Sequence, residues 1–311
     1  MRSLVLLLAS TIMMSSCAVD ASEADQDTPP ALMSWNDLLS QERPEPTLTV
    51  SYGDGPAHVV DLWRPDAPGP HPVVLMVHGG CWQKAIADRT LMNYAAEALR
   101  QRGLAVWNIE YRGVDEEGGG YPGTFLDVSH ATKALFEQGP DLNLDVSRIV
   151  AYGHSAGGHL VAWLSSQHNL PEGSLLETGL DIPMRAVIVS GGLADLEVSK
   201  PVTLQTCLAS VMDDLTGASD PTRTNSLADT SPAEMLPPNS LILNVNGAQD
   251  RIAPPSLGEA FTLKVQTSGG HSNYIEVSNT GHVELVAPGT EAFNVQADLM
   301  ERYLQDEAGE R

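Results

Sequence analysis

The chain has 311 residues, of which 42% are hydrophobic and 18% charged, and this is enough apolar material for one large core. Its formal net charge of -23 at pH 7 argues against binding to nucleic acid, because contact with a phosphate backbone requires clustered lysine and arginine. Acidity of this degree favours solubility, and a saline habitat is a second explanation that the sequence leaves open.

The first 17 residues have the pattern of a secretory signal peptide. Arg2 gives a positive start, and the apolar run that follows from Leu4 is too short to span a bilayer of about 30 Å. Met14-Ser15-Ser16-Cys17 resembles a bacterial lipobox, in which the cysteine becomes the lipidated first residue of the mature chain. We therefore expect export and a lipid anchor at Cys17, which would tether the protein to a membrane of the cell envelope or periplasm. Ordinary cleavage near Cys17 or Ala18, which would give a soluble secreted protein, is the alternative.

Residues 18–44 are interpreted as an acidic flexible linker, because Asp20–Pro30 is polar, acidic and ends in prolines. One folded domain is expected over residues 45–306. Two cysteines lie in this domain, Cys81 and Cys207, and an oxidising compartment would permit a disulfide between them. Two cysteines do not define a disulfide framework, so the sequence favours unpaired thiols and leaves the pairing open. Cysteine and histidine show no metal-ligand spacing, and we expect neither a metal nor a cofactor.

The predicted elements of the domain alternate between strands and helices. Short apolar runs at 48–52 and 58–63 flank Gly53-Asp54-Gly55 and predict a hairpin. A continuous apolar run predicts a buried strand at 73–77, and a second buried strand is expected at 104–109. Further strands are expected at 148–152, 186–189, 241–245 and 274–277. Apolar residues at helical spacing predict helices at 91–99, 125–136, 156–165, 256–265 and 293–303. This order indicates an α/β fold with a mostly parallel sheet, covered by helices on both faces, with antiparallel strands at one edge.

Residues 193–238 interrupt this alternation between two core strands. The segment is rich in Asp, Ser, Thr and Pro, and we expect it to form a partial lid over the carboxyl end of the sheet, where sites form in such folds. Its carboxylates and its few large apolar residues favour a solvated flap over an apolar tunnel.

Gly153-His154-Ser155-Ala156-Gly157 joins a predicted strand to a predicted helix. A sharp turn in this position lifts the serine hydroxyl out of the sheet, and small flanking residues let the backbone crowd there. The helix that follows directs its N–H groups toward the same point. The pattern predicts Ser155 as a nucleophile, and the alternative is an ordinary serine in a glycine-rich turn.

A serine hydroxyl needs a base to accept its proton, and the base needs an acid to fix its tautomer. Among the nine histidines, His282 is the predicted base because it stands in the loop after the last predicted strand. Asp250, in the loop after the strand at 241–245, is the predicted acid, with Asp195 and Glu284 as rivals. The resulting order of Ser, Asp and His along the chain is the order expected of an α/β-hydrolase.

The tetrahedral intermediate of such a reaction needs N–H donors. Ala156 supplies one, and Gly80 or Cys81, in the loop after the strand at 73–77, supplies the other, because glycines let the backbone approach the oxyanion. A plain glycine turn is the alternative. Cys81 is not expected to act as a nucleophile, since no base is placed for it. Trp82 and Tyr121 are candidates for the substrate pocket, with packing beneath the loops as the alternative.

The loop His78-Gly79-Gly80-Cys81-Trp82 and the turn at 153–157 together resemble the esterase and kynurenine-formamidase-like branch of the α/β-hydrolase superfamily. The resemblance extends through Trp107–Arg112 and the loops of Asp250 and His282, over residues 45–305. It implies the α/β-hydrolase fold, a Ser-His-Asp triad, an acyl-enzyme and a small-molecule ester as substrate.

Two other functions remain open beside the esterase. Kynurenine formamidases carry an aromatic residue where Cys81 stands and act on a cytoplasmic metabolite, so an arylformamidase activity is the alternative within the fold. A non-catalytic binding protein on a hydrolase scaffold is the third hypothesis. Within the esterase interpretation, the aromatic content of only 5% argues against a deep aromatic acyl channel and favours short acyl groups, as on acetylated or feruloylated sugars. The sequence gives no indication of the oligomeric state.

Overall fold

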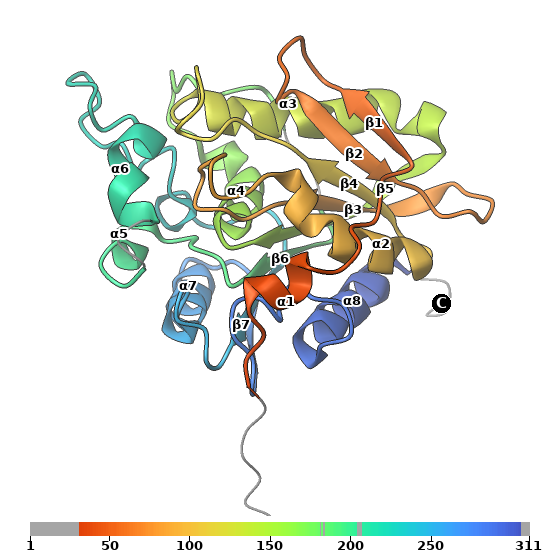
Figure 1. Cartoon of the computed structure of the whole chain (residues 1–311). Coiled ribbons are helices and arrows are strands. Elements are labelled where there is room, and N and C mark those ends of the chain that lie inside the picture. Colours follow the sequence, from red (N-terminus) through yellow and green to blue (C-terminus); the bar gives the residue numbers. More distant parts are fainter. Residues whose placement is uncertain (1–30, 181, 183, 204–206, 306–311) are drawn as a thin grey trace, which may run out of the picture. The chain divides into compact units, whose positions relative to one another are not determined.

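The computed structural model describes residues 31–305, apart from 181, 183 and 204–206. The predicted signal peptide and Cys17, the predicted lipidation site, therefore lie outside the described residues. Within that range, no helix has the length and apolar character needed to cross a membrane. The helices (α), 3-10 helices (η) and strands (β) follow one another along the chain (Figure 1) as α1 (Trp35–Leu39), β1 (Leu48–Ser51), β2 (Val59–Trp63), β3 (His71–Val77), η1 (Arg89–Met92), α2 (Asn93–Gln101), β4 (Ala105–Ile109), α3 (Gly123–Gln138), η2 (Pro140–Leu142), β5 (Leu144–His154), α4 (Ala156–Leu164), η3 (Gln167–Asn169), β6 (Ala186–Ser190), α5 (Leu196–Ser199), α6 (Leu208–Thr216), η4 (Pro232–Glu234), β7 (Ile242–Gly247), α7 (Pro255–Thr267), β8 (Ser272–Val277) and α8 (Glu291–Leu304).

The strands of the described region form one eight-stranded sheet in the order β1-β2-β4-β3-β5-β6-β7-β8. β1 pairs with β2, and β2 with β4, in the antiparallel sense, whereas the other neighbouring strands are parallel. The predicted mostly parallel sheet with an antiparallel edge is thus confirmed. Val77 at the end of β3 pairs with Ile109 on one side and with Gly153 on the other. The loops after β3, β4 and β5 therefore leave the sheet side by side.

Helices cover both faces of this sheet, as the alternation of elements predicts (Figure 1). The buried side chains of α3, α4 and α7 belong to one apolar cluster with strand residues such as Leu75 and Val187. Those of α2 and α8 belong to a second cluster with strand residues such as Val74 and Ile188, which point to the opposite face. Neighbouring positions on a strand thus serve different cores, which explains why the central strands read as continuous apolar runs.

Residues 31–44 differ from the flexible linker that the sequence suggests for 18–44. Ser34 begins α1 with reciprocal hydrogen bonds, since its Oγ accepts from the Asp37 N–H and its own N–H donates to the Asp37 carboxylate. Leu38 is fully buried and belongs to the same apolar cluster as Leu285, near the other end of the chain. The linker prediction is therefore wrong for residues 31–44, because one buried leucine and a well-capped helix start attach this segment to the domain.

The segment 193–238 is also less solvated than its composition indicates. It contains α5, α6 and η4, and α6 buries Leu208, Val211, Met212 and Leu215 in the core cluster. These four residues are spaced i, i+3, i+4 and i+7, so they form one face of the helix. The described part of the segment is therefore a packed excursion of the core, and the prediction of a solvated flap is wrong.

Candidate active site

The turn between β5 and α4 holds Ser155 in an unusual backbone conformation. Its φ of 55° and ψ of -118° lie in a region that a residue with a side chain occupies only when its surroundings impose it. The Ser155 N–H donates to the Ser190 carbonyl at 2.9 Å. The glycines around it are needed for space, because a Cβ on Gly157 would lie 2.1 Å from the Val77 carbonyl oxygen. This is the strand-turn-helix geometry that the motif predicts.

His282 and Asp250 form a buried hydrogen-bonded pair. The distance between Nδ1 of His282 and Oδ2 of Asp250 is 2.6 Å. The other oxygen of Asp250 accepts from the N–H groups of Ile252 at 2.8 Å and Ala253 at 2.9 Å. Because a carboxylate only accepts, Nδ1 of His282 must carry the proton, and Nε2 is left as the basic nitrogen.

The loops of Ser155, Asp250 and His282 meet around Gly191, the residue that follows β6. A Cβ built on Gly191 would lie 3.2 Å from Oδ2 of Asp250 and 3.3 Å from Cε1 of His282. On the nucleophile's side, the imidazole of His154 lies 4.3 Å from that of His282, measured between ring centroids. Nε2 of His154 donates to the His282 carbonyl at 3.1 Å, so the residue before the nucleophile also fixes the backbone of the histidine loop.

The two rival acids are engaged elsewhere. Asp195 accepts from the N–H of Val198 at the start of α5 and pairs with Lys264. Glu284 accepts from the Gly281 N–H at 3.0 Å and from the Met33 N–H. Asp250 is therefore the carboxylate that the structure brings to the imidazole of His282.

The loop after β3 has three consecutive residues with positive φ: Gly80 at 114°, Cys81 at 53° and Trp82 at 55°. Gly80 has no room for a side chain, because a Cβ there would lie 2.8 Å from Cβ of Ala87. The Gln83 N–H closes the turn on the Gly80 carbonyl at 2.9 Å. A Cβ on the preceding Gly79 would lie 3.1 Å from Cβ of Ser155, so this loop runs beside the nucleophile. The donor roles of Gly80, Cys81 and Ala156 stay predictions that suit this placement.

A disulfide joins Cys81 to Cys207, two residues that lie 126 positions apart. The sequence favours unpaired thiols, and the structure corrects that expectation. The bond attaches the predicted oxyanion loop to the start of α6, and it leaves Cys81 without a thiol that could act as a nucleophile. No spacing rule reveals this pair, because the contact depends on how the excursion 193–238 packs.

Trp82 anchors the same loop from inside the protein. It is fully buried, and its Nε1 donates to Nδ1 of His159 at 3.2 Å, while Nε2 of His159 donates to the Thr230 carbonyl at 2.7 Å. Burial lowers the pKa of His159 to about 4, so this histidine is neutral in the folded protein at neutral pH. These contacts favour the packing interpretation of Trp82 over a role in the substrate pocket.

Tyr121, the other pocket candidate, is also held by structural contacts. Its hydroxyl donates to Oδ2 of Asp229 at 3.2 Å, and the guanidinium of Arg223 lies 3.7 Å from its ring centroid. Arg223 in turn pairs with Asp229, so the three side chains form one cluster. Packing explains Tyr121 as well, and a contact with substrate stays a prediction.

A buried ion pair supports the predicted oxyanion loop, and the sequence analysis does not single it out. Nε2 of His78 lies 2.9 Å from Glu110, whose other oxygen accepts from Nζ of Lys84 at 2.9 Å. The His78 ring stacks on Tyr111 with 4.3 Å between ring centroids. Burial alone would raise the pKa of Glu110, but His78 and Lys84 outweigh it and lower that pKa to about 2. The stretch Trp107–Arg112, over which the sequence resembles the esterase branch, contains Glu110 and Tyr111. The sequence therefore already marked the residues that hold His78.

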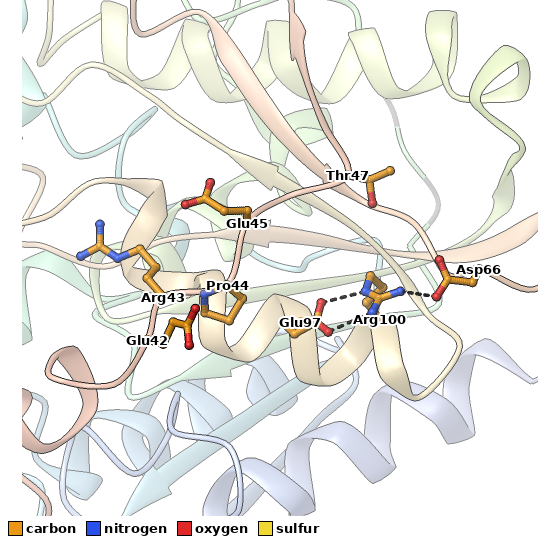
Figure 2. A pocket seen from close by; sticks show the side chains of 8 residues that line it. All are labelled: Glu42, Arg43, Pro44, Glu45, Thr47, Asp66, Glu97 and Arg100. Atoms are coloured by element: carbon orange, nitrogen blue, oxygen red, sulfur yellow. Dashed lines mark hydrogen bonds and ion pairs between the residues drawn. The ribbon is translucent and has the colours of Figure 1, made fainter.

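Of two hollows on the surface of the described residues, one includes a residue of the predicted triad and the other does not. An open hollow of about 620 Å³ contains no residue of the predicted triad, and Figure 2 shows that its Arg100 points to Glu97 and Asp66, with which it forms ion pairs. It is lined by Glu42, Arg43, Pro44, Glu45, Thr47, Asp66, Glu97 and Arg100. A hollow of about 340 Å³ is lined by Leu32 and residues 248–251, and so includes Asp250. Among the described residues, no group of three or more His, Cys, Asp or Glu side chains could hold a metal ion.

Several solved structures with the same fold are of esterases. A carbohydrate esterase from gut microbiota superposes with a TM-score of 0.68 at 20% identity, covering 86% of this chain and 99% of that one. Esterase B from Lactobacillus rhamnosis (HN001) superposes with a TM-score of 0.69 at 16% identity, covering 84% of this chain and 87% of that one. At these identities the likeness establishes the α/β-hydrolase fold.

Sequence comparison adds a closer relation. Esterase LipC of Mycobacterium tuberculosis is 28% identical over 242 residues, which are 75% of this chain and 58% of that protein. The chain thus spans less than two thirds of that relative's length. The BD-FAE family model matches residues 60–265, a range that contains Ser155 and Asp250 and ends before His282. Because this match covers more than half of a chain with the α/β-hydrolase fold, the chain belongs to the BD-FAE family.

Proposed function

We propose that this protein is a serine hydrolase that cleaves carboxylic esters through an acyl-enzyme. The observation that carries the proposal is the buried hydrogen bond of 2.6 Å between His282 and Asp250, beside the strained turn of Ser155. The family and the names of its relatives, which are esterases, support the same reaction class.

The proposed reaction uses these groups in two half-reactions. Nε2 of His282 accepts the proton of the Ser155 hydroxyl as Oγ attacks the ester carbonyl carbon. The oxyanion accepts hydrogen bonds from the N–H of Ala156 and from an N–H of Gly80 or Cys81. When the tetrahedral intermediate collapses, His282 gives its proton to the departing alcohol and the acyl group stays on Ser155. Water then repeats the sequence, which releases the carboxylic acid and the free serine.

Asp250 holds a fixed charge next to the histidine throughout this cycle. Its carboxylate keeps Nδ1 of His282 protonated, and it stabilises the imidazolium that forms when Nε2 takes up the serine proton. Because its second oxygen accepts two backbone N–H groups, the carboxylate cannot rotate away without breaking them. Nδ1 of His282 is therefore held by a fixed acceptor before substrate arrives.

We infer that the acyl group is short. Among the described residues of the excursion 193–238, Val198 and Val202 are the large apolar side chains that stay exposed, and this leaves little apolar surface to cover a long chain. The net charge of -23 also disfavours docking on anionic lipid surfaces. One structural neighbour is a carbohydrate esterase. An acetylated or feruloylated sugar is therefore the class of natural substrate that we propose.

A panel of model substrates tests this function. We expect kcat/KM for p-nitrophenyl esters to be highest from acetate to butyrate, and to exceed kcat/KM for N-formylkynurenine. A maximum at octanoate or palmitate would contradict the short-acyl proposal. A preference for N-formylkynurenine would instead make the protein an arylformamidase. If the protein neither turns over any of these substrates nor reacts with a fluorophosphonate, the hypothesis of a non-catalytic binding protein would be favoured.

We also propose that the protein is exported and anchored by lipid at Cys17. The support is the sequence Met14-Ser15-Ser16-Cys17 and the acidic stretch that follows. One acyl chain gives only marginal binding to a membrane, so stable attachment needs the several chains of a bacterial lipoprotein. In a bacterium with lipoprotein processing, Cys17→Ser should move the protein from the membrane fraction to the soluble fraction. An unchanged membrane fraction would refute the anchor.

A further inference from the structure

The segment at residues 31–39 contacts both histidines of the candidate active site. The indole of Trp35 lies edge-on to the imidazole of His282, with 6.3 Å between ring centroids and an interplanar angle of 81°. It makes the same kind of contact with His154 at 6.1 Å and 72°. Trp35 is half-buried and belongs to α1, the short helix drawn in red-orange in Figure 1. The ring of the proposed base therefore contacts two other rings, that of His154 beside the nucleophile and that of Trp35 from outside the predicted catalytic domain, and these two rings also contact each other.

The backbone of the histidine loop is fixed by the same segment. Glu284 is buried, and its carboxylate accepts from two N–H groups, that of Gly281 at 3.0 Å and that of Met33. One side chain thus joins the residue before His282 to the residue two positions before Trp35. Leu32 completes the contact, because a Cβ on Gly281 would lie 3.3 Å from Cδ1 of Leu32.

These contacts act on the part of the base that Asp250 leaves free. The hydrogen bond to Asp250 fixes Nδ1 but still allows the imidazole to tilt about that bond, and the tilt decides whether Nε2 faces the serine hydroxyl. The contacts of the ring with Trp35 and His154, which also pack against each other, oppose the tilt. Effective catalysis needs this alignment, because a displacement of about 1 Å in a reacting group can reduce the rate about 100-fold.

We infer that residues 31–39 are a positioning element for the catalytic histidine: Trp35 holds the imidazole of His282, and Glu284 binds the segment to the histidine loop. The inference rests on the proposed function only in taking Ser155 as the nucleophile and His282 as its base. It assigns a role to Glu284, which competes with Asp250 as the acid when only the sequence is considered. Trp35 is a positioning residue here, because it acts through His282.

Two rates measured on the full chain test this inference. One is the second-order rate of fluorophosphonate labelling, which needs the base but no particular substrate, and the other is kcat with KM for p-nitrophenyl acetate. For Trp35→Ala we expect labelling and kcat to fall by about 10- to 100-fold, with KM changed less than about threefold. Trp35→Phe keeps a ring in place and should restore both rates to within a few-fold of the wild type.

The matched control is Glu42→Ala, an exposed position three residues beyond this segment, which should leave both rates unchanged. Wild-type rates in Trp35→Ala would overturn the inference, and so would equal losses in Trp35→Ala and Trp35→Phe. Thermal unfolding of each variant shows whether a loss follows from a smaller folded fraction. If Trp35→Ala does not fold, Glu284→Gln tests the same segment. This variant leaves one N–H without its acceptor and should slow fluorophosphonate labelling. An unchanged labelling rate would overturn the inference.

The test of the Trp35 variants and the test with the ester panel can fail independently of each other. A wild-type protein that a fluorophosphonate labels but that cleaves no ester of the panel would contradict the proposed substrate. The labelling rates of the Trp35 variants would still report whether the segment positions the base.

Discussion

Removing the disulfide with Cys207→Ala is expected to lower both stability and activity. Alanine is chosen because Cys207 is buried, and a serine hydroxyl there would need a new hydrogen-bond partner. With 126 positions between the two cysteines, the entropy of the closed loop corresponds to about 5 kcal/mol, and native disulfides contribute about 2–5 kcal/mol in practice. At about 2–4 °C per kcal/mol for a domain of this size, Tm should fall by about 5–15 °C.

The effect on activity is expected to be smaller than the loss of an oxyanion donor. The loop at 80–82 keeps its turn hydrogen bond and the buried anchor of Trp82, so we expect kcat to fall by less than the roughly 100-fold that follows removal of one donor. Thermal unfolding and ester hydrolysis of Cys207→Ala, beside wild type with and without a reductant, measure both effects. A variant with wild-type Tm would refute the reasoning, and so would a reductant that changes the variant as much as the wild type.

Two other perturbations test the site and its surroundings. Asp250→Asn keeps an oxygen for the two backbone N–H groups, but it can present an amide N–H to Nδ1 of His282 and so force the wrong tautomer of that histidine. We expect kcat to fall about 10⁴-fold with little change in Tm. Turnover within tenfold of the wild type would exclude Asp250 as the acid. Burial, with the nearby charge of His282, holds the pKa of His154 well below its ordinary value, and burial outweighs the hydrogen bond to the Thr230 carbonyl and lowers the pKa of His159 to about 4. Below about pH 6.5 these two histidines therefore bind protons in the unfolded chain but stay neutral in the folded protein. The free energy of unfolding should fall as pH drops from 6.5 toward 4, by up to about 1.4 kcal/mol per pH unit for each histidine. Urea unfolding at pH 7.5 and 5.0 measures this loss, and equal stabilities at the two pH values would contradict it.

The sheet and the loops of the proposed triad were predictable because each depends on local pattern. The apolar run at 73–77 is buried on both faces, and the motif around Ser155 stands where a strand meets a helix. His282 and Asp250 follow predicted strands, and the carboxyl ends of parallel strands meet at one edge of the sheet. The structure brings these two side chains together as the sequence predicts.

The contacts that were missed join segments far apart in the chain. The disulfide depends on the packing of α6, whose buried face of Leu208, Val211, Met212 and Leu215 was a readable helical pattern in a segment judged by its acidity. The sequence places Trp35 in the predicted linker 18–44 for the same reason. The sequence Ser34-Trp35-Asn36-Asp37 nevertheless has the spacing of a capped helix start, which could have indicated an ordered segment. Which surface that helix contacts depends on Leu38 and Glu284, and local pattern does not contain that information.

Identification of the residue that a fluorophosphonate modifies tests the nucleophile itself. The labelled protein is digested and the adduct located by mass spectrometry, and ester hydrolysis by Ser155→Ala is measured beside it. We expect one adduct, on Ser155, and a fall in kcat of at least about 10³-fold in the variant with an unchanged Tm. An adduct on another residue, or a Ser155→Ala variant that hydrolyses esters at nearly the wild-type rate, would contradict the proposed mechanism.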